Sequence, residues 1–431
     1  MSKFTDALRS LTGGRGISQY SMVIALVVIL VVFEGLTGGV TLRPGNIINV
    51  VQQYAYILIL AIGMVMVIIA GHIDLSVGSV AAFVGVVVAQ AMGEWHLPPG
   101  IAMLLGLVVG VIVGAWQGFW VAFVRVPAFI VTLAGQLVFR GANQLVGDAT
   151  PHTTPDSYNW IGAGFIPDFG GGPFSNGTLL LGLVAIVAMI VLEVRGRARR
   201  VRMNAQLPPL WRSIVKMVVL GGVIAVATYL FASGAPGSSF PVAGIIAGAL
   251  IIIYGFVTRN TIFGRQIYAV GGNAAAAQLS GVNSRSINFF VMLNMAVLAA
   301  IAGMVYVGYS NASGPSDGTG WELDAIAAVF VGGAAVSGGI GTVGGSIVGA
   351  FVMAFLSNGL SLMGIDSTIV AIVRGLVLLV AVAFDVYNKT QGRPSIIGWL
   401  LKNATRRPTA VTETGQPAQP AGIAEDSKVN Q

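Results

Sequence analysis

The residues closest to a catalytic arrangement lie together in the stretch Gly71-His72-Ile73-Asp74-Leu75-Ser76. Histidine, aspartate and serine are the side chains that form an activated nucleophile with its base. At adjacent spacing the three side chains point in different directions, so the stretch is a weak match to a catalytic site. It is better explained as a polar break between two apolar segments, with Asp74 or Ser76 capping the following helix.

The rest of the sequence offers no motif for catalysis, phosphate binding or metal binding. It has no glycine-rich phosphate loop ending in lysine, and none of its lysines lies in a glycine-rich loop. His72, His96 and His152 are too dispersed for a metal site, and the lack of cysteine excludes thiolate zinc sites. We therefore expect no catalytic residue, no metal and no cofactor on this chain.

A second group of residues is suited to contact with a partner protein. Residues 258–287 form a polar island between apolar segments, with three arginines and no acid. Within it, Asn273 can cap a helix, the following alanines favour one, and Gly281 can end it in the left-handed conformation. A short capped helix on the basic side of a membrane is suited to bind a cytoplasmic partner protein. An ordinary loop with one helical turn is the alternative.

The composition places these residues in a membrane protein. The 431-residue chain is 55% hydrophobic and 9% charged, with a mean hydropathy of +0.84. A soluble domain carries roughly 25% charged residues, so a soluble fold is excluded. The net charge of +7 comes from basic residues beside apolar segments, which is a topology signal and does not indicate a nucleic-acid partner.

Apolar runs of about 20 residues predict transmembrane helices. We expect an all-α integral membrane protein, a polytopic bundle of about 10–12 transmembrane helices. No small-residue cleavage site follows the first run, so it is retained in the mature chain. The predicted spans are 20–37, 47–70, 79–94, 100–124, 128–147, 177–193, 217–233, 239–257, 288–309, 325–340, 342–363 and 368–387.

The basic residues predict the orientation, with both termini in the cytoplasm. In this orientation 20 of the 23 lysines and arginines are cytoplasmic, while the external loops carry acids. The predicted organisation is a cytoplasmic segment at 1–19, a membrane domain at 20–389, and a cytoplasmic, partly disordered tail at 390–431. The membrane domain contains a basic cytoplasmic loop at 194–216 and the polar loop at 258–287.

Glycines at every fourth position predict close helix packing. One row is Gly106, Gly110, Gly114 and Gly118, and small residues at this spacing let two helix backbones touch. A second row is Gly333, Ser337, Gly341, Gly345 and Gly349. Paired glycines in and beside that second row also permit bends in the chain.

Five stretches of the sequence carry a resemblance to known proteins. They are 70–79 (AGHIDLSVGS), 126–133 (VPAFIVTL), 271–282 (GGNAAAAQLSGV), 320–330 (GWELDAIAAVF) and 381–389 (AVAFDVYNK). Together they resemble the permease subunits of carbohydrate ABC importers, within the ribose-permease-like family. The xylose or multiple-monosaccharide subgroup is the most similar, because of His72 and the AFDVYNK ending. The resemblance extends over about 47–389.

The resemblance implies a type II ABC importer-like bundle in a bacterial plasma (inner) membrane. Its expected partners are a second permease copy, an ABC ATPase that holds ATP and Mg²⁺, an extracytoplasmic sugar-binding protein and membrane lipid. The chain itself is a non-catalytic translocation subunit working by alternating access. The cargo the resemblance implies is D-xylose, followed by other monosaccharides.

The resemblance also assigns roles to individual residues. The coupling helix contacting the ATPase comprises Gly271, Gly272, Asn273, Ala276, Ala277, Leu279, Ser280 and Gly281. The translocation path has an inner gate with His72, Asp74, Ser76 and Gly78, and an outer opening with Trp321, Glu322 and Asp324.

Three other classes of protein remain as alternatives. An ion-coupled sugar transporter requires intramembrane acids and inverted halves with matching broken helices, and the sequence does not supply these clearly. An ABC permease for a nucleoside or a branched-chain amino acid differs only in its cargo. A membrane-embedded glycosyl-transfer enzyme needs clustered acids, and only Asp317, Glu322 and Asp324 come close.

Overall fold

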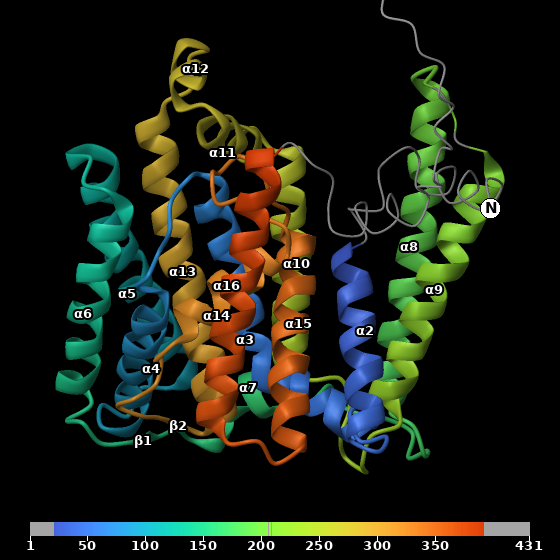
Figure 1. The fold of residues 1–431 in the computed structure, drawn as a ribbon. Coiled ribbons are helices and arrows are strands. Elements are labelled where there is room, and N and C mark those ends of the chain that lie inside the picture. The colour runs from blue at the N-terminus through green and yellow to red at the C-terminus, as the bar shows by residue number, and fades with distance from the viewer. Residues whose placement is uncertain (1–20, 206, 208, 392–431) are drawn as a thin grey trace, which may run out of the picture.

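The chain folds into a bundle of helices with one two-residue strand pair (Figure 1). This computed structural model describes residues 21–391 apart from 206 and 208. The predicted segment 1–19 and all but the first two residues of the predicted tail lie outside the described residues. In chain order, the first elements are α2 (Ser21–Leu36), α3 (Pro44–Ile69), α4 (Val77–Gly93), α5 (Pro99–Phe119), the π-helical turn η2 (Trp120–Val124), α6 (Ala128–Val146), β1 (His152–Thr153) and α7 (Asp156–Ala163). They are followed by α8 (Asn176–Arg202), α9 (Leu210–Ala232), α10 (Val242–Asn260), α11 (Ile262–Gly272), α12 (Ala274–Leu279), α13 (Ser284–Ser310), β2 (Ala312–Ser313), α14 (Trp321–Val331), α15 (Val343–Leu362) and α16 (Ser367–Gln391).

The helices confirm the expectation of a polytopic all-α membrane protein. Within the described residues, seven are long and apolar enough to cross a membrane, among them α3, α5 and α13. Shorter apolar helices include α4 and most of α2 and α16. Each predicted span overlaps one of these helices or α6 or α14, because runs of apolar residues are stable in lipid only when their backbone bonds internally.

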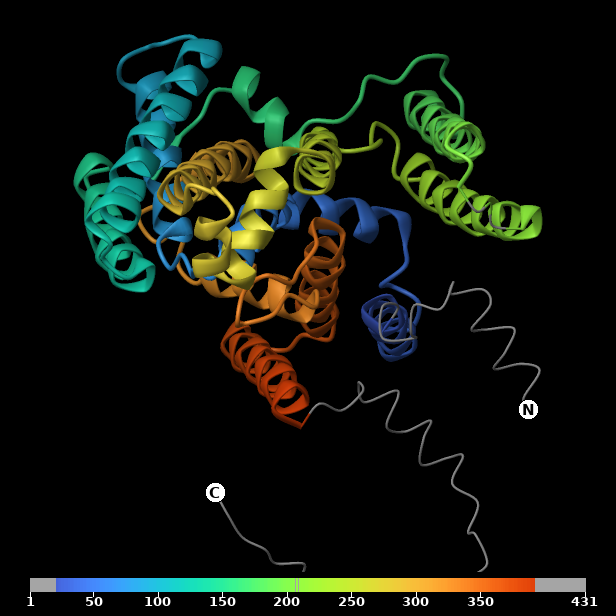
Figure 2. The same ribbon diagram turned by 90° about the horizontal axis from the view of Figure 1, so that it is seen from above.

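The core of the bundle is α3, which packs against α10, α13, α14 and α15. Its most apolar window is 83% buried, so it is enclosed by protein and not by lipid. In contrast, α8 and α9 pack mainly on each other and stand to one side of the remaining helices when the molecule is seen from above (Figure 2). The bundle therefore has a compact part around α3 and a separate helix pair.

The first predicted glycine row forms a close contact between α5 and α13. On α5, a Cβ on Gly110 would lie 2.7 Å from the Ala300 Cβ, and one on Gly114 would lie 2.7 Å from the Leu293 Cα. Small residues let the α5 backbone touch α13, so this prediction is confirmed. The second row is wrong as a helix face, because it crosses a non-helical stretch between α14 and α15. Gly333, in that stretch, has a φ of +88°. The bends that the paired glycines permit are therefore real at 332–341.

Two predicted loops are shorter than expected because helices continue past the apolar residues. The basic loop at 194–216 is mostly helix, since α8 runs to Arg202 and α9 begins at Leu210. Arginine and alanine are good helix formers, so the last apolar residue marks the membrane edge and not the helix end. The polar loop at 258–287 contains α12 as predicted, and also the unpredicted α11.

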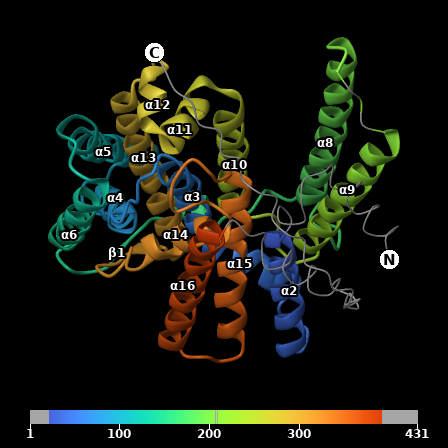
Figure 3. The ribbon, with the colours of Figure 1, turned by 45° about the horizontal axis from the view of Figure 1, so that its top comes forward.

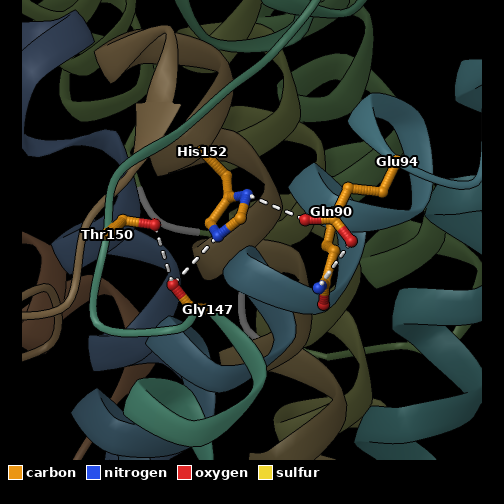
Figure 4. A network of polar contacts seen from close by, with 5 residues as sticks. All are labelled: Gln90, Glu94, Gly147, Thr150 and His152. Atoms are coloured by element: carbon orange, nitrogen blue, oxygen red, sulfur yellow. Dashed lines mark hydrogen bonds and ion pairs between the residues drawn. The ribbon is translucent and has the colours of Figure 1, made fainter.

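One end of the bundle is joined by short-range polar contacts (Figure 4). β1 pairs antiparallel with β2, and α7, which follows β1, is joined to α13 by the Tyr158 hydroxyl, which donates to the Met304 carbonyl at 2.9 Å. At the start of β1, His152 Nε2 donates to the Gly147 carbonyl at 2.9 Å. Its Nδ1 lies 3.7 Å from Glu94 Oε1. These contacts, between the end of α4, the segment after α6, and α7, lie at the end of the bundle opposite α11 and α12 (Figure 1).

Among the helices that border the predicted gate residues, α4 and α14 are too short to cross the bilayer alone. With 17 and 11 residues, α4 and α14 are about 25 and 17 Å long, compared with a hydrocarbon layer of about 30 Å. The crossing is completed by non-helical backbone at 70–76 before α4 and at 332–342 after α14. Such backbone is stable at membrane depth only inside protein or beside water. These two breaks border the residues that the sequence marked as functional.

Candidate coupling and gating site

The short helix predicted within 271–281 is present as α12, with both of its caps, and its coupling role stays a prediction. Asn273 Oδ1 accepts a hydrogen bond from the Ala276 amide at 3.0 Å, as the N-cap prediction requires. At the other end Gly281 has a φ of +85°, and the Val282 amide donates to the Ala277 carbonyl at 3.0 Å. This pattern closes a helix through a left-handed glycine. The six-residue helix is therefore a defined projection, which Figure 3 shows at the end of the molecule that comes forward.

The two faces of α12 differ in exposure. Ala277 is 5% exposed and faces the protein, while Leu279 is 92% exposed at the end of the helix. Ala276 and Ser280 are also exposed. A leucine held almost fully in water on a rigid, capped helix is suited to insertion into a partner's apolar cleft.

The base of this projection rests directly on the end of α3. A Cβ on Gly271 would overlap the Ile69 carbonyl oxygen, whereas one on Gly272 would meet nothing within 4 Å. Ile69 is also held from the other side, because the Gly339 amide donates to its carbonyl at 2.8 Å. The end of α11, the end of α3 and the 332–341 bend therefore form one contact of backbone against backbone, with no flexible side chain between them.

From this contact, the chain continues into the break at 70–76 and its polar network. Asp74 Oδ1 accepts from the Ser76 amide at 2.8 Å and from the Ser76 hydroxyl at 2.6 Å. Gln117 Nε2 of α5 donates to the Ser76 hydroxyl oxygen at 2.7 Å. All three side chains are buried. The predicted capping of α4 is wrong in detail: Ser76 occupies the N-cap position, but its side chain bonds Asp74 and does not cap. The network fixes the break to α5.

His72 does not join this network. It lines a cavity of about 560 Å³ together with Arg125, Gln278, Ser284 and Asn288, and its Nε2 is buried without a hydrogen-bond partner. Ser76 bonds Asp74 directly, with no histidine between them, so His72, Asp74 and Ser76 do not form a nucleophile–base arrangement. The cavity instead has His72 of the break and Gln278 of α12 in the same lining.

Gly78 brings the two predicted gate groups together. A Cβ on Gly78 would overlap the Gly318 carbonyl oxygen and lie 2.6 Å from Glu322 Oε2. Glu322 Oε1 accepts from Gln136 Nε2 of α6 at 2.8 Å, while its Oε2 is buried without a partner. The start of α4 therefore packs against the start of α14, although the sequence placed them at opposite gates. Those gate roles stay predictions.

Trp321 and Asp324 extend this junction to other helices. The Trp321 ring centroid lies 4.3 Å from that of Tyr56 on α3 and 4.4 Å from that of Tyr306 on α13. Asp324 accepts from Arg374 Nη1 of α16, at 2.9 Å to Oδ1 and 2.7 Å to Oδ2. Removing one partner of an ion pair in a low-dielectric site strongly destabilises the folded protein, because the other charge is left uncompensated. The short helix α14 is therefore held by an aromatic cluster on one side and an ion pair on the other.

The sequence identified the segments of this site but missed several partners. Gln117, Gln136 and Tyr56 lie on helices far along the chain from the segments they contact, and Tyr306 lies on the helix that precedes α14. Their only sequence signal is a polar or hydroxylated side chain within an apolar run, which is a functional hint in a membrane helix.

These features define a class of protein: a polytopic, all-helical membrane subunit with a projecting helix at one end and two interrupted helices at its centre. Comparison with known proteins identifies the family. The chain belongs to the family described as branched-chain amino acid transport system / permease component, whose profile matches residues 46–382. The members of this family are permease components of transport systems, and this chain is a multi-pass membrane permease component.

Curated relatives cover nearly the same length. The chain is 37% identical to the xylose transport system permease protein XylH of Haemophilus influenzae, over 86% of this chain and 96% of that protein. It is also 37% identical to the XylH protein of Escherichia coli K12, over 86% and 92%. Against the ribose import permease protein RbsC of Escherichia coli K12, it is 32% identical over 86% and 94%. No solved structure matches. The predicted resemblance is confirmed.

Proposed function

We propose that this chain is the membrane-spanning subunit of an ATP-driven, binding-protein-dependent monosaccharide importer, with D-xylose as its first cargo. The observation that carries the coupling part is the capped α12, with Leu279 exposed at its end and Gly271 seated on the Ile69 carbonyl. A capped, rigid helix whose base packs directly against the backbone of α3 is suited to receive force from a partner.

The energy comes from a separate chain in this proposal. The sequence carries no phosphate loop, so ATP and Mg²⁺ are held by an ABC ATPase that receives α12 in a cleft. Two copies of the permease form the path between them, and an extracytoplasmic sugar-binding protein delivers the cargo. Both termini and α12 face the cytoplasm, following the positive charge of those segments.

The path of coupling follows the described contacts. ATPase closure moves α12, the Gly271–Ile69 contact passes the movement to the break at 70–76, and Gly78 passes it to α14. Backbone contacts of this kind are stiff, because no side chain can change rotamer to absorb the displacement. Glu322 and Trp321 then change their position relative to α4, which opens the path to one side or the other.

The cargo is proposed from the relatives, since xylose and ribose permeases match most of the chain. A neutral, hydroxylated cargo also suits external loops that carry acids, because a negative surface repels anions. The family description names branched-chain amino acids, which makes that cargo the second candidate.

The test is uptake of labelled D-xylose, D-ribose and leucine by a bacterium carrying the gene, its deletion, and the deletion with the gene restored. We expect xylose uptake to fall on deletion and to return with the wild-type gene, while leucine uptake is unchanged. Loss of leucine uptake with unchanged xylose and ribose uptake contradicts the sugar assignment. Unchanged uptake of all three contradicts both candidate cargoes.

A further inference from the structure

The separated pair α8 and α9 contains a polar pocket that transport does not account for. Only 17% of the most apolar window of α8 and 6% of that of α9 is buried, so lipid surrounds most of the pair. The two helices join the rest of the bundle near the start of α8 and the end of α9, where Phe231 packs with Ile48. Their other ends reach the same end of the molecule as α11 and α12 (Figure 1).

A pocket of about 610 Å³ lies between the two helices where their apolar residues give way to charged ones. Four of the side chains that line it are cationic, namely Arg197, Arg200, Arg212 and Lys216. Glu193 is the one acid among the described residues that line it, and Val219 and Leu220 form its apolar part. One wall is therefore basic and the other suits hydrocarbon.

The pocket is held in place by a polar network across the two helices. Lys216 Nζ lies 2.7 Å from Glu193 Oε2, and the Ser213 hydroxyl donates to Glu193 Oε1 at 2.9 Å. Arg197 Nη1 donates to the Ser213 oxygen at 2.8 Å. The single carboxylate is thus already engaged by two donors. It leaves most of the positive charge in the pocket uncompensated.

Arg212 shows most directly that an acceptor fits this pocket. Its guanidinium lies over the Trp211 ring, with 5.7 Å from Cζ to the ring centroid, and its Nε is buried without a hydrogen-bond partner. A guanidinium binds phosphate oxygens through several N–H groups at once. Basic pockets between transmembrane helices at a membrane surface bind the headgroups of anionic lipids.

We propose that the α8–α9 pocket binds the phosphate group of an anionic phospholipid. Arg200 and Arg212 hold the phosphate oxygens, and Val219 and Leu220 contact the start of the acyl chains. A free phosphate offers the same oxygens, but it leaves the apolar wall uncovered. The lipid covers both walls, and the pair already faces lipid along its length. Binding at this site anchors α8 and α9 at a fixed depth in the membrane.

The test is native mass spectrometry of the full chain released from nanodiscs of equal parts phosphatidylcholine and phosphatidylglycerol. We expect retained phosphatidylglycerol on the wild type. The double variant Arg200→Gln/Arg212→Gln removes two of the pocket's four cationic side chains and should lose most of the retained phosphatidylglycerol, by about tenfold or more. The control Arg195→Gln/Arg199→Gln removes the same charge from exposed positions of α8 that do not line the pocket, and it should retain the lipid. Equal loss in both variants, or loss in neither, overturns the proposal.

Two further arms separate the sources of phosphate and guard against misfolding. Inorganic phosphate, added at the same concentration as the lipid, should not displace phosphatidylglycerol, and displacement assigns the pocket to a free anion instead. Glu193→Gln removes the acid and leaves every cation, so retention of phosphatidylglycerol should rise. A fall or no change in Glu193→Gln contradicts the proposal without depending on a loss-of-binding variant.

Discussion

Gly271 and Gly272 are adjacent in the chain and differ completely in their surroundings. The Cα of Gly271 lies against the Ile69 carbonyl with no room for a Cβ, while that of Gly272 has open space beside it. Both are helical residues at the end of α11, so an alanine suits the backbone at either position. Alanine substitutions at the two positions therefore separate the effect of close backbone packing from the effect of losing glycine's flexibility.

We expect Gly271→Ala to reduce uptake by about tenfold or more, because overpacking a close contact costs about 1–3 kcal/mol and shifts α12 away from α3. Gly272→Ala should leave uptake within about twofold of the wild type. Labelled-sugar uptake in cells with equal amounts of membrane-inserted protein measures both. Similar uptake in the two variants would show that the Gly271–Ile69 contact does not transmit coupling.

A second residue prediction concerns Gly78, where α4 meets α14. Gly78→Ala pushes a methyl group into the Gly318 carbonyl and toward Glu322 Oε2, so the two short helices must separate. Uptake should fall by about tenfold, again for a cost of about 1–3 kcal/mol. Gly100→Ala is the matched control, since a Cβ there meets nothing within 4 Å in the first turn of α5. Full uptake by Gly78→Ala would show that the contact between α4 and α14 is not part of the coupling path.

At the scale of elements, the sequence predicted what depends on local pattern. Apolar runs gave the position of each span, and Asn273 with Gly281 gave both ends of α12, because a cap depends on residues within one turn. α11 and the extension of α8 to Arg202 were missed, because apolar runs reveal the membrane edge and not helical structure in water.

The arrangement of the site could not be predicted, because it depends on which helices pack together. Nothing within 70–78 indicates that Gly78 meets Gly318, which lies far along the chain. The Asp324–Arg374 ion pair was likewise hidden, because the two charges lie in different apolar segments and nothing local pairs them. Partners of this kind are set by the tertiary fold of the whole bundle.

The placement of the helix ends leads to a test of orientation at the element scale. α12 and α7 lie at opposite ends of the bundle, and Ser280 and Ser157 are exposed on them (Figure 1). The chain has no cysteine, so Ser280→Cys and Ser157→Cys each give a single reactive thiol. With α12 in the cytoplasm, a membrane-impermeant maleimide added to intact cells should label only Ser157→Cys. Breaking the cells should expose both thiols, and labelling of Ser280→Cys alone in intact cells reverses the orientation.

At the scale of the whole molecule, the compact part around α3 connects α12 to the α4–α14 junction. The breaks at 70–76 and 332–342 also occur in ion-coupled transporters, where interrupted helices hold the substrate and ions. Here Asp74 is engaged by Ser76 and Asp324 by Arg374, while Glu322 keeps one buried oxygen without a hydrogen-bond partner. The source of energy therefore distinguishes the two kinds of transporter better than the breaks do.

The last prediction concerns that source of energy. The purified chain should hydrolyse no ATP by itself, and with its ATPase in proteoliposomes it should import sugar only when ATP is present. Leu279→Arg should reduce ATP-driven uptake by about 100-fold, because a charge in an apolar cleft costs several kcal/mol. Met203→Arg adds the same charge at another exposed position at this end of the molecule and should import normally. A proton or sodium gradient that drives import without ATP, or full uptake by Leu279→Arg, would mean that α12 does not receive the force.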